Sequence, residues 1–220
     1  MLQIKRPDSL SKIAEEHIRT SIVTGHFQLG ESLQEAKLST AMGISKTPIR
    51  EALAALNLQG LVRIIPQRGA FVFSLSRDDV LQLCKYRFIL ESNALERAAE
   101  DNHAGLLDAL GDIVSRMSAA QQSGAFERYL ELDADFHDAF FQHCGNRYLQ
   151  DGYQRVSDVV KTMRTHLSAR PDRTEKSFQE HEAILMHLRQ ADIPSATNVL
   201  KQQITRGERS YSDLASVNQV

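Results

Sequence analysis

The 220-residue sequence has only two cysteines, Cys84 and Cys144, and no stretch that approaches the roughly 18 apolar residues of a membrane span. Two cysteines are too few for a disulfide scaffold and are typical of a reducing compartment. Near the N-terminus, charges and Pro7 interrupt the apolar residues of Met1 to Lys12, so we expect no signal peptide. These absences favour a soluble cytoplasmic protein that contacts no membrane.

The overall composition is that of a globular chain, with 42% hydrophobic and 25% charged residues. These values exclude disorder and collagen-like repeats, and the length fits one domain or two small ones. Net charge is −2, but residues 1–75 carry +3 and the remaining residues carry −5. A basic first third on an acidic body indicates that only the first third meets a polyanion.

Glycines punctuate the first third and separate short periodic segments. Apolar spacing predicts a helix over 10–22 that Gly25 ends, and a second helix over 33–42 that Gly43 ends. A third helix begins near Ser45 or Thr47, either of which is a suitable N-cap, and ends at Gly60. Two short strands, 61–65 and 70–73, then flank a turn at 66–69. The order predicts a helix-turn-helix followed by a β-hairpin.

After residue 76 the strand signals disappear. Helical periodicity predicts helices near 80–98, 105–122, 125–144, 147–168, 174–190 and 194–212. We therefore predict a mainly α protein with two domains. Residues 1–75 form a winged helix-turn-helix with a small β-hairpin, residues 76–220 form an all-helical bundle, and Ser74-Leu75-Ser76 is the linker.

The start of the third helix presents polar side chains suited to DNA, namely Ser45, Lys46, Thr47 and Arg50. Hydroxyl and backbone N–H groups at a helix start hold phosphate, and Lys46 or Arg50 can reach guanine O6 and N7. Arg68-Gly69 at the hairpin tip is placed to enter a minor groove. The alternative is that these residues are ordinary solvated surface groups, with Glu51 as an ion-pair partner.

Fixed-spacing motifs run through this region. They are Gly30-x-x-Leu33-x-Glu35-x-x-Leu38, the run from Met42 to Leu53, Leu56, Gly60-Leu61-Val62 and Arg68-Gly69-x-x-Val72. Together they resemble the GntR family of bacterial transcription regulators. The resemblance implies DNA contacts at Ser45, Lys46, Thr47, Arg50, Arg68 and Gly69. Family members often have a basic residue at the position of Ala36, so one contact is missing here.

The remaining two thirds resemble the all-helical FCD domain of the FadR subfamily. The residues that carry this resemblance are Arg87-x-x-Leu90-Glu91, Asp133-x-x-Phe136-His137, Gly145-Asn146 and Glu180-His181. It implies a divalent metal (Zn, Ni, Mn or Fe) on Asp133, His137 and His181, and a homodimer. The usual fourth ligand is a histidine, but this chain has Gln203, whose neutral carbonyl is a poorer zinc donor. The resemblance also implies a small organic acid as effector.

Several of these residues have a second interpretation. Asp133 and His137 are four residues apart on one helical face, so they suit either a shared ion or a simple hydrogen bond. Arg87 is either a bidentate donor to an effector carboxylate or the ion-pair partner of Glu91. Asn146 is a further effector candidate, and Arg164 and Tyr129 are weaker ones.

Two classes of function follow from these observations. The first is a ligand-responsive regulator that binds a pseudo-palindromic operator as a dimer, with affinity set by the effector. The second is a metal-dependent enzyme, or a direct metal sensor, that uses Asp133, His137 and His181. The sequence has no phosphate loop, nucleophile elbow or His-Glu-x-x-His segment, which favours the regulator and predicts no enzymatic activity.

Overall fold

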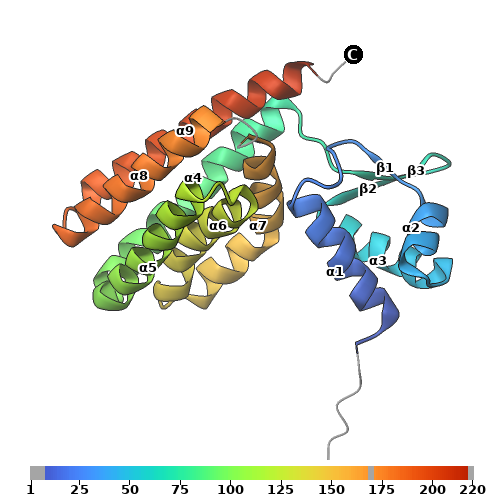
Figure 1. Cartoon of the computed structure of the whole chain (residues 1–220), viewed down its shortest axis with the longest axis horizontal. Coiled ribbons are helices and arrows are strands. Elements are labelled where there is room, and N and C mark those ends of the chain that lie inside the picture. The colour runs from blue at the N-terminus through green and yellow to red at the C-terminus, as the bar shows by residue number, and fades with distance from the viewer. Residues whose placement is uncertain (1–7, 168–170, 218–220) are drawn as a thin grey trace, which may run out of the picture. The chain divides into compact units, whose positions relative to one another are not determined.

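The computed structural model describes residues 8–167 and 171–217. The chain divides into two compact units, Met1–Ser74 and Leu75–Val220. The first unit contains all the strands of the described residues, and the second is built of helices (Figure 1). A mainly α protein, with a winged helix-turn-helix before a helical bundle, is confirmed.

The first unit is built around three helices, α1 (Leu10–Val23), α2 (Glu35–Met42) and α3 (Lys46–Leu58). α1 packs against α3 through fully buried side chains that include Ile18, Ile22 and Leu56. Gly43 ends α2 with a φ of 65°, a conformation that glycine adopts without the steric cost of a Cβ. The predicted second helix was too long at its start, because Leu33 lies in a strand rather than in α2.

Three strands form the wing, in the order β1-β3-β2 and antiparallel throughout. β2 (Val62–Ile65) and β3 (Gly69–Val72) confirm the predicted hairpin, whereas β1 (Ser32–Leu33) was missed because two residues show no periodicity. The turn between β2 and β3 closes through a 3.0 Å bond from the Arg68 N–H to the Ile65 carbonyl. Gln67 occupies the third turn position with a φ of 63°, as a type II turn requires.

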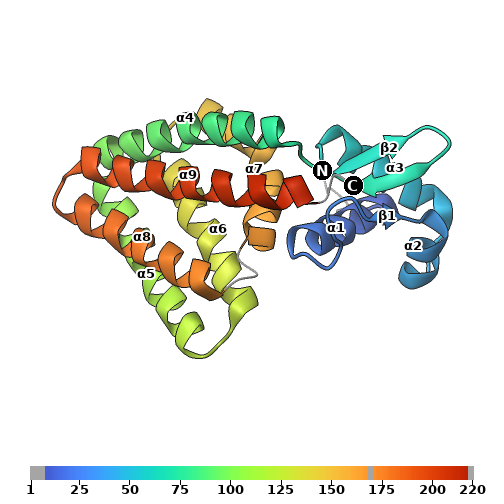
Figure 2. The same cartoon turned by 90° about the horizontal axis from the view of Figure 1, so that it is seen from above.

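The second unit consists of α4 (Arg77–Asp101), α5 (His103–Gln122), α6 (Phe126–His143), α7 (Arg147–Leu167), α8 (Pro171–Arg189) and α9 (Ile193–Val217). Pro171 and Pro194 lie in first turns, where a missing N–H costs nothing. α4 packs along α9, and α5 packs against α6 and α8 (Figure 2). Among the described residues, no helix has both the length and the apolar character of a membrane span.

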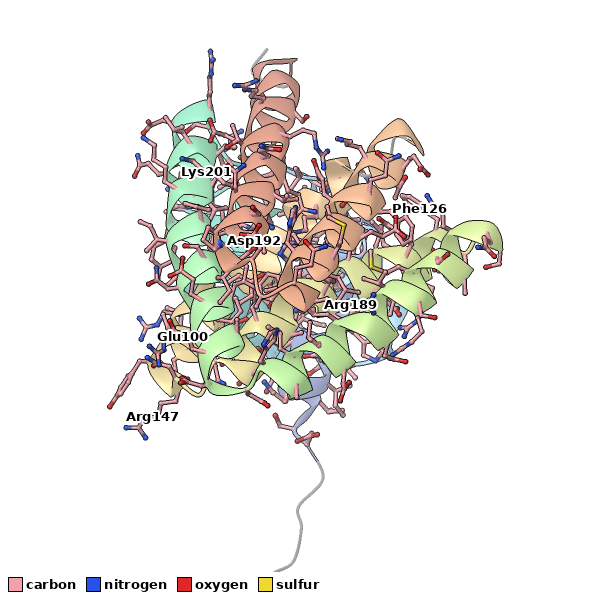
Figure 3. All side chains as sticks on the ribbon, turned by 90° about the vertical axis from the view of Figure 1, so that its left-hand side faces the viewer. Glu100, Phe126, Arg147, Arg189, Asp192 and Lys201 are labelled. Carbon is pink, nitrogen blue, oxygen red and sulfur yellow. The ribbon has the colours of Figure 1, made fainter. Side chains whose placement is uncertain are left out.

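α4 begins with a reciprocal cap. The Ser76 hydroxyl accepts a bond from the Asp79 N–H, and the Asp79 carboxylate accepts one from the Ser76 N–H. Polar residues are unusually frequent inside this unit and come from several helices, among them Arg87, Glu91, Asp133, His137, Arg164, His181 and Gln203. By contrast, Glu100 on α4 and Lys201 on α9, both labelled in Figure 3, are exposed. The buried charges need compensating partners.

Candidate nucleic-acid interface and candidate metal centre

The start of α3 presents polar side chains to solvent. Ser45, Lys46, Thr47 and Arg50 are all exposed, while Ile49, Ala52 and Leu53 are buried. Ser45 occupies the N-cap position, although its side chain makes no capping bond, and Thr47 lies inside the helix. The Ser39 hydroxyl donates a 2.6 Å bond to the Ile44 carbonyl and closes the turn before α3. The four candidate DNA-contacting side chains therefore share one solvent-facing surface.

Arg50 is held from the neighbouring helix. Its Nε donates a 2.6 Å bond to Glu35 Oε2 at the first residue of α2. Glu51, the partner expected from the sequence, is exposed, and Arg50 forms its ion pair with Glu35. Because the bond uses Nε, it directs the guanidinium without using the Nη groups that pair with guanine.

The wing presents the other two candidate DNA residues. Arg68 and Gly69 are both exposed at the β2–β3 turn. Gly69 has a φ of 101°, a region that is open to glycine and disfavoured for L side chains. The glycine thus permits the sharp change of direction that presents Arg68 at the tip.

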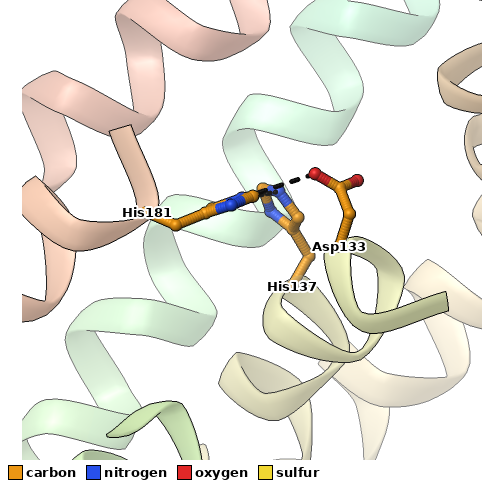
Figure 4. A group of neighbouring side chains, drawn as sticks. All are labelled: Asp133, His137 and His181. Carbon is orange, nitrogen blue, oxygen red and sulfur yellow. Dashed lines mark hydrogen bonds and ion pairs between the residues drawn. The ribbon is translucent and has the colours of Figure 1, made fainter. Parts of the chain in front are cut away.

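Inside the helical unit, Asp133, His137 and His181 bring three donor atoms within 4.8 Å of one another (Figure 4). Asp133 and His137 project from one face of α6, and His181 faces them from α8. The two Nε2 atoms are 3.4 Å apart, and His181 Nε2 is 3.6 Å from Asp133 Oδ1. Donors held about 2.1 Å from one ion at tetrahedral angles lie about 3.4 Å apart, so these spacings fit a metal ion.

Glu91 organises the cluster from α4. It is fully buried, and its Oε2 accepts a 2.8 Å bond from His137 Nδ1. That bond places the His137 proton on Nδ1 and leaves the Nε2 lone pair facing the cluster, as in carboxylate–histidine–metal sites. Arg87 also donates to Glu91 through Nε and Nη2, and Arg164 Nη2 lies 3.5 Å from Glu91 Oε1.

Burial and neighbouring charges set the protonation of the cluster. Burial is the largest single influence on the pKa of Glu91 and would raise it, but the charge of Arg87, the bond from His137 and the charge of Arg164 together hold this pKa well below its usual range. Burial also acts most strongly on Asp133 and would raise its pKa, but the positive groups around it, Arg164 first among them, together lower this pKa. Burial lowers the pKa of His137 and brings that of His181 to about 3. Two carboxylates and two neutral imidazoles, the ligand forms that metals require, are therefore present at neutral pH.

Gln203, on α9, completes the ring of side chains. Its Nε2 lies 3.0 Å from His181 Nε2 and 3.4 Å from Ser177 Oγ, while its Oε1 is buried without a hydrogen bond among the described residues. The Ser177 hydroxyl also donates to Asp133 Oδ1 at 3.2 Å. The residues present therefore fit a divalent ion through three ligands, with an amide where a fourth would be.

The effector candidates are not all brought together. Arg87 is buried in its ion pair with Glu91, whereas Asn146 is exposed and its Oδ1 accepts bonds from the Tyr148 and Leu149 N–H groups at the start of α7. Tyr129 donates to the Thr174 carbonyl on α8, which is a structural bond. Arg164 joins the cluster. Its Nη1 lies 3.6 Å from Asp133 Oδ2, and this nitrogen makes no hydrogen bond among the described residues.

A cavity of about 470 Å³ lies between α6 and α7, and its lining contains none of the cluster residues. Its lining includes Asp138, Gln142, Ser157 and Lys161, and also the buried ring of Tyr153. Burial raises the pKa of Tyr153, while the charge of Arg164 acts to lower it and that of Glu91 to raise it. The volume is in the range of small-molecule sites.

Glu91 was missed as a member of the site. Its four-residue spacing from Arg87 indicated an ion pair, but nothing in the sequence linked it to His137, which is 46 residues away. Ser177 was also missed and carries no local signal. The signals that could have found Glu91 are its position among the buried residues of α4 and its place in the Arg87-x-x-Leu90-Glu91 motif.

The comparisons with known proteins agree with this division. Residues 10–72 match the model of the bacterial regulatory proteins of the gntR family, and residues 82–206 match the FCD domain. The chain is 26% identical over 180 residues to the HTH-type transcriptional regulator YdhC of Bacillus subtilis (strain 168), covering 81% of this chain and 80% of that protein. It is 23% identical over 202 residues to the gluconate operon transcriptional repressor of Bacillus licheniformis, covering 90% and 83%.

The same likeness extends to solved structures. A crystal structure of a GntR transcriptional regulator from Rhodococcus sp. RHA1 superposes with a TM-score of 0.81 over 93% of this chain and 98% of that one, at 18% identity. The FCD match alone spans more than half of the chain. With an exposed helix-turn-helix surface in one unit and an FCD domain in the other, the chain belongs to the GntR family of bacterial transcription regulators, as a member with a C-terminal FCD domain.

Proposed function

We propose that this regulator binds a pseudo-palindromic operator as a homodimer and that a small organic acid, held with a divalent metal ion in the FCD domain, changes its affinity for DNA. The observation that carries the proposal is the buried Asp133, His137 and His181 cluster, with Arg164 Nη1 beside it, 3.6 Å from Asp133 Oδ2 and without a hydrogen bond among the described residues. A buried donor without an acceptor is costly, and an incoming carboxylate would satisfy it.

In the DNA-binding unit, we assign Ser45, Lys46, Thr47 and Arg50 to the major groove and Arg68 and Gly69 to the wing contact. Their shared exposure supports the assignment. Hydroxyls at the start of α3 suit phosphate, and the Arg50 Nη groups suit guanine. Two copies are needed to read two half-sites about one helical turn apart.

Charge balance favours an anionic effector. The carboxylates of Glu91 and Asp133 compensate the guanidinium groups of Arg87 and Arg164, so the cluster is neutral while its imidazoles are neutral. A bound divalent ion adds two positive charges in a buried site, where uncompensated charge is expensive. A small carboxylic acid supplies the missing negative charge. One relative is named for a gluconate operon, and gluconate is an acid of this class.

Within this proposal, Asp133, His137 and His181 hold the ion, which supplies a positive centre for the effector carboxylate. Arg164 and Arg87 donate hydrogen bonds to the acid or to the carboxylates that surround it. Asn146 is proposed as an effector residue from the resemblance alone, because its observed bonds cap α7.

The test is a titration of operator affinity. The operator is first selected from random DNA and labelled. Full-length protein, stripped of metal with a chelator, is then bound to it, and binding is followed by fluorescence anisotropy. The titration is repeated with a panel of mono- and dicarboxylic acids, with and without Zn²⁺, Ni²⁺, Mn²⁺ or Fe²⁺. We expect one of the acids to change the operator affinity at least about tenfold, which corresponds to an allosteric coupling free energy of about 1–3 kcal/mol. His137→Ala should lose that shift, and the matched exposed variant Asp135→Asn should keep it. An acid response that is identical in His137→Ala would refute the site.

The direct metal sensor is tested by the same titration, because metal without acid would then change operator affinity by itself. The metal-dependent enzyme has the three-ligand cluster in its favour, but the relatives are transcription regulators. Sedimentation of the protein, first free and then with its operator, checks the homodimer. A monomer bound to the operator at micromolar protein concentration would contradict it.

A further inference from the structure

Gln203 is the feature of the cluster that the proposed function leaves unexplained. It is buried on α9, and its amide nitrogen lies 3.0 Å from His181 Nε2. The amide oxygen is buried and has no hydrogen-bond partner among the described residues. An unpaired buried acceptor costs about 1–3 kcal/mol, so a side chain in this state gains from any cation that it can meet.

The amide can present either end to the cluster. Nitrogen and oxygen occupy nearly equivalent positions about the last side-chain bond, so a half-turn exchanges them without moving α9. With the nitrogen inward, as observed, Gln203 donates to the lone pair of His181 Nε2. That is the lone pair a metal ion would need. Metal binding therefore has to break this bond, and the amide must turn, because its N–H groups repel a cation.

We propose that Gln203 is the fourth protein ligand of the metal, binding through Oε1, and that it shifts the site away from Zn²⁺ towards Mn²⁺. The inference rests on the metal binding of the proposed function and adds the selectivity of the site. Two imidazoles, one carboxylate and one amide oxygen make a set with two oxygens. Oxygen donors suit Mn²⁺, whereas imidazole suits Zn²⁺ and Ni²⁺.

Two neighbours support the role of the amide. The Ser177 hydroxyl accepts a 3.4 Å bond from Gln203 Nε2 and donates a 3.2 Å bond to Asp133 Oδ1, which places the amide beside the carboxylate ligand, although the half-turn of the amide gives up the bond from Nε2. In addition, Gln203 approaches the same His181 Nε2 that lies 3.4 Å from His137 Nε2. The amide therefore lies at the edge of the donor set, at the distance expected for a neighbouring ligand.

The experiment measures Zn²⁺ and Mn²⁺ binding to chelator-stripped full-length protein by calorimetry, with no DNA and no acid present. If Gln203 ligates, Gln203→Leu should weaken Mn²⁺ binding at least about tenfold, and Gln203→Glu should restore or strengthen it. Gln203→His should strengthen Zn²⁺ binding at least about tenfold and leave Mn²⁺ nearly unchanged, so the Zn²⁺-to-Mn²⁺ preference rises. Gln202→His, an exposed neighbour on α9, should change neither affinity.

The alternative outcomes are distinct. If Gln203→Leu binds either metal as tightly as the wild type or more tightly, the amide is only a competitor for His181 and the inference is wrong. If neither the wild type nor Gln203→His binds metal, both this inference and the metal part of the proposed function fail. Melting temperatures without metal identify any variant that has not folded, and the Gln203→Glu and Gln203→Leu pair still decides the question if Gln203→His is lost.

Discussion

Glu91 is the residue whose replacement should destabilise the FCD domain most sharply. It is fully buried and lies between Arg87 and Arg164, while it also accepts a bond from His137. Glu91→Gln keeps the shape but removes the charge that balances the guanidinium groups. Removing one partner of a buried ion pair typically costs about 3–5 kcal/mol, because the other charge stays buried and uncompensated. For a chain of this size that corresponds to a fall in melting temperature of about 10 °C or more.

The measurement is urea unfolding of metal-free protein at neutral pH, followed by circular dichroism. Glu100→Gln is the matched control, because it removes the same charge from the same helix at an exposed ion pair with Arg97. Exposed pairs contribute about 1 kcal/mol or less, so this variant should unfold nearly like the wild type. A loss below about 1 kcal/mol for Glu91→Gln, or equal losses for the two variants, would refute the idea that Glu91 compensates the buried arginines.

Three further predictions concern the DNA-binding surface and the helix ends. Arg50→Ala should weaken operator binding by about 1–3 kcal/mol and reduce discrimination against altered operators, with an unchanged melting temperature. The control variant Arg116→Ala, on α5, should leave DNA footprints intact. Gly43→Ala should cost about 1 kcal/mol of unfolding free energy from its left-handed φ alone, since no atom crowds that position, and Gly43→Asn should cost less. Asn146→Ala should cost about 1 kcal/mol of unfolding free energy by removing the α7 cap, and Asn146→Ser should recover most of it. If both variants lose the acid response, the Asn146 amide contacts the effector. If both retain it, the amide only caps α7.

Much of the fold followed from local patterns. The helices and the hairpin have periodicity or turn residues that the chain carries in itself, as at Gly43 and at the turn 66–69. β1 escaped prediction because two residues carry no period and pair only through β3, more than thirty residues later. In the cluster too, contacts between residues far apart in the sequence could not be predicted from local patterns. Asp133 and His137 share one helix, and their spacing suited either a shared ion or a hydrogen bond; the metal site itself was implied by the resemblance to the FCD domain. The contact of Glu91 with His137 depends on how α4 packs against α6.

α4 has a consequence for communication along the chain. It starts two residues after the boundary between the two units, with a firm Ser76–Asp79 cap, and it carries Glu91 about four turns further on. Fifteen residues of helix span about 22 Å, so a tilt of about 5° at Glu91 moves the other end by about 2 Å. This stretch of α4 therefore joins the Glu91 carboxylate to the first residues of the helical unit through an uninterrupted helix. Glycines at the exposed positions Gln82 and Lys85 would soften it, and we expect them to weaken the acid response while acid and operator each bind as before.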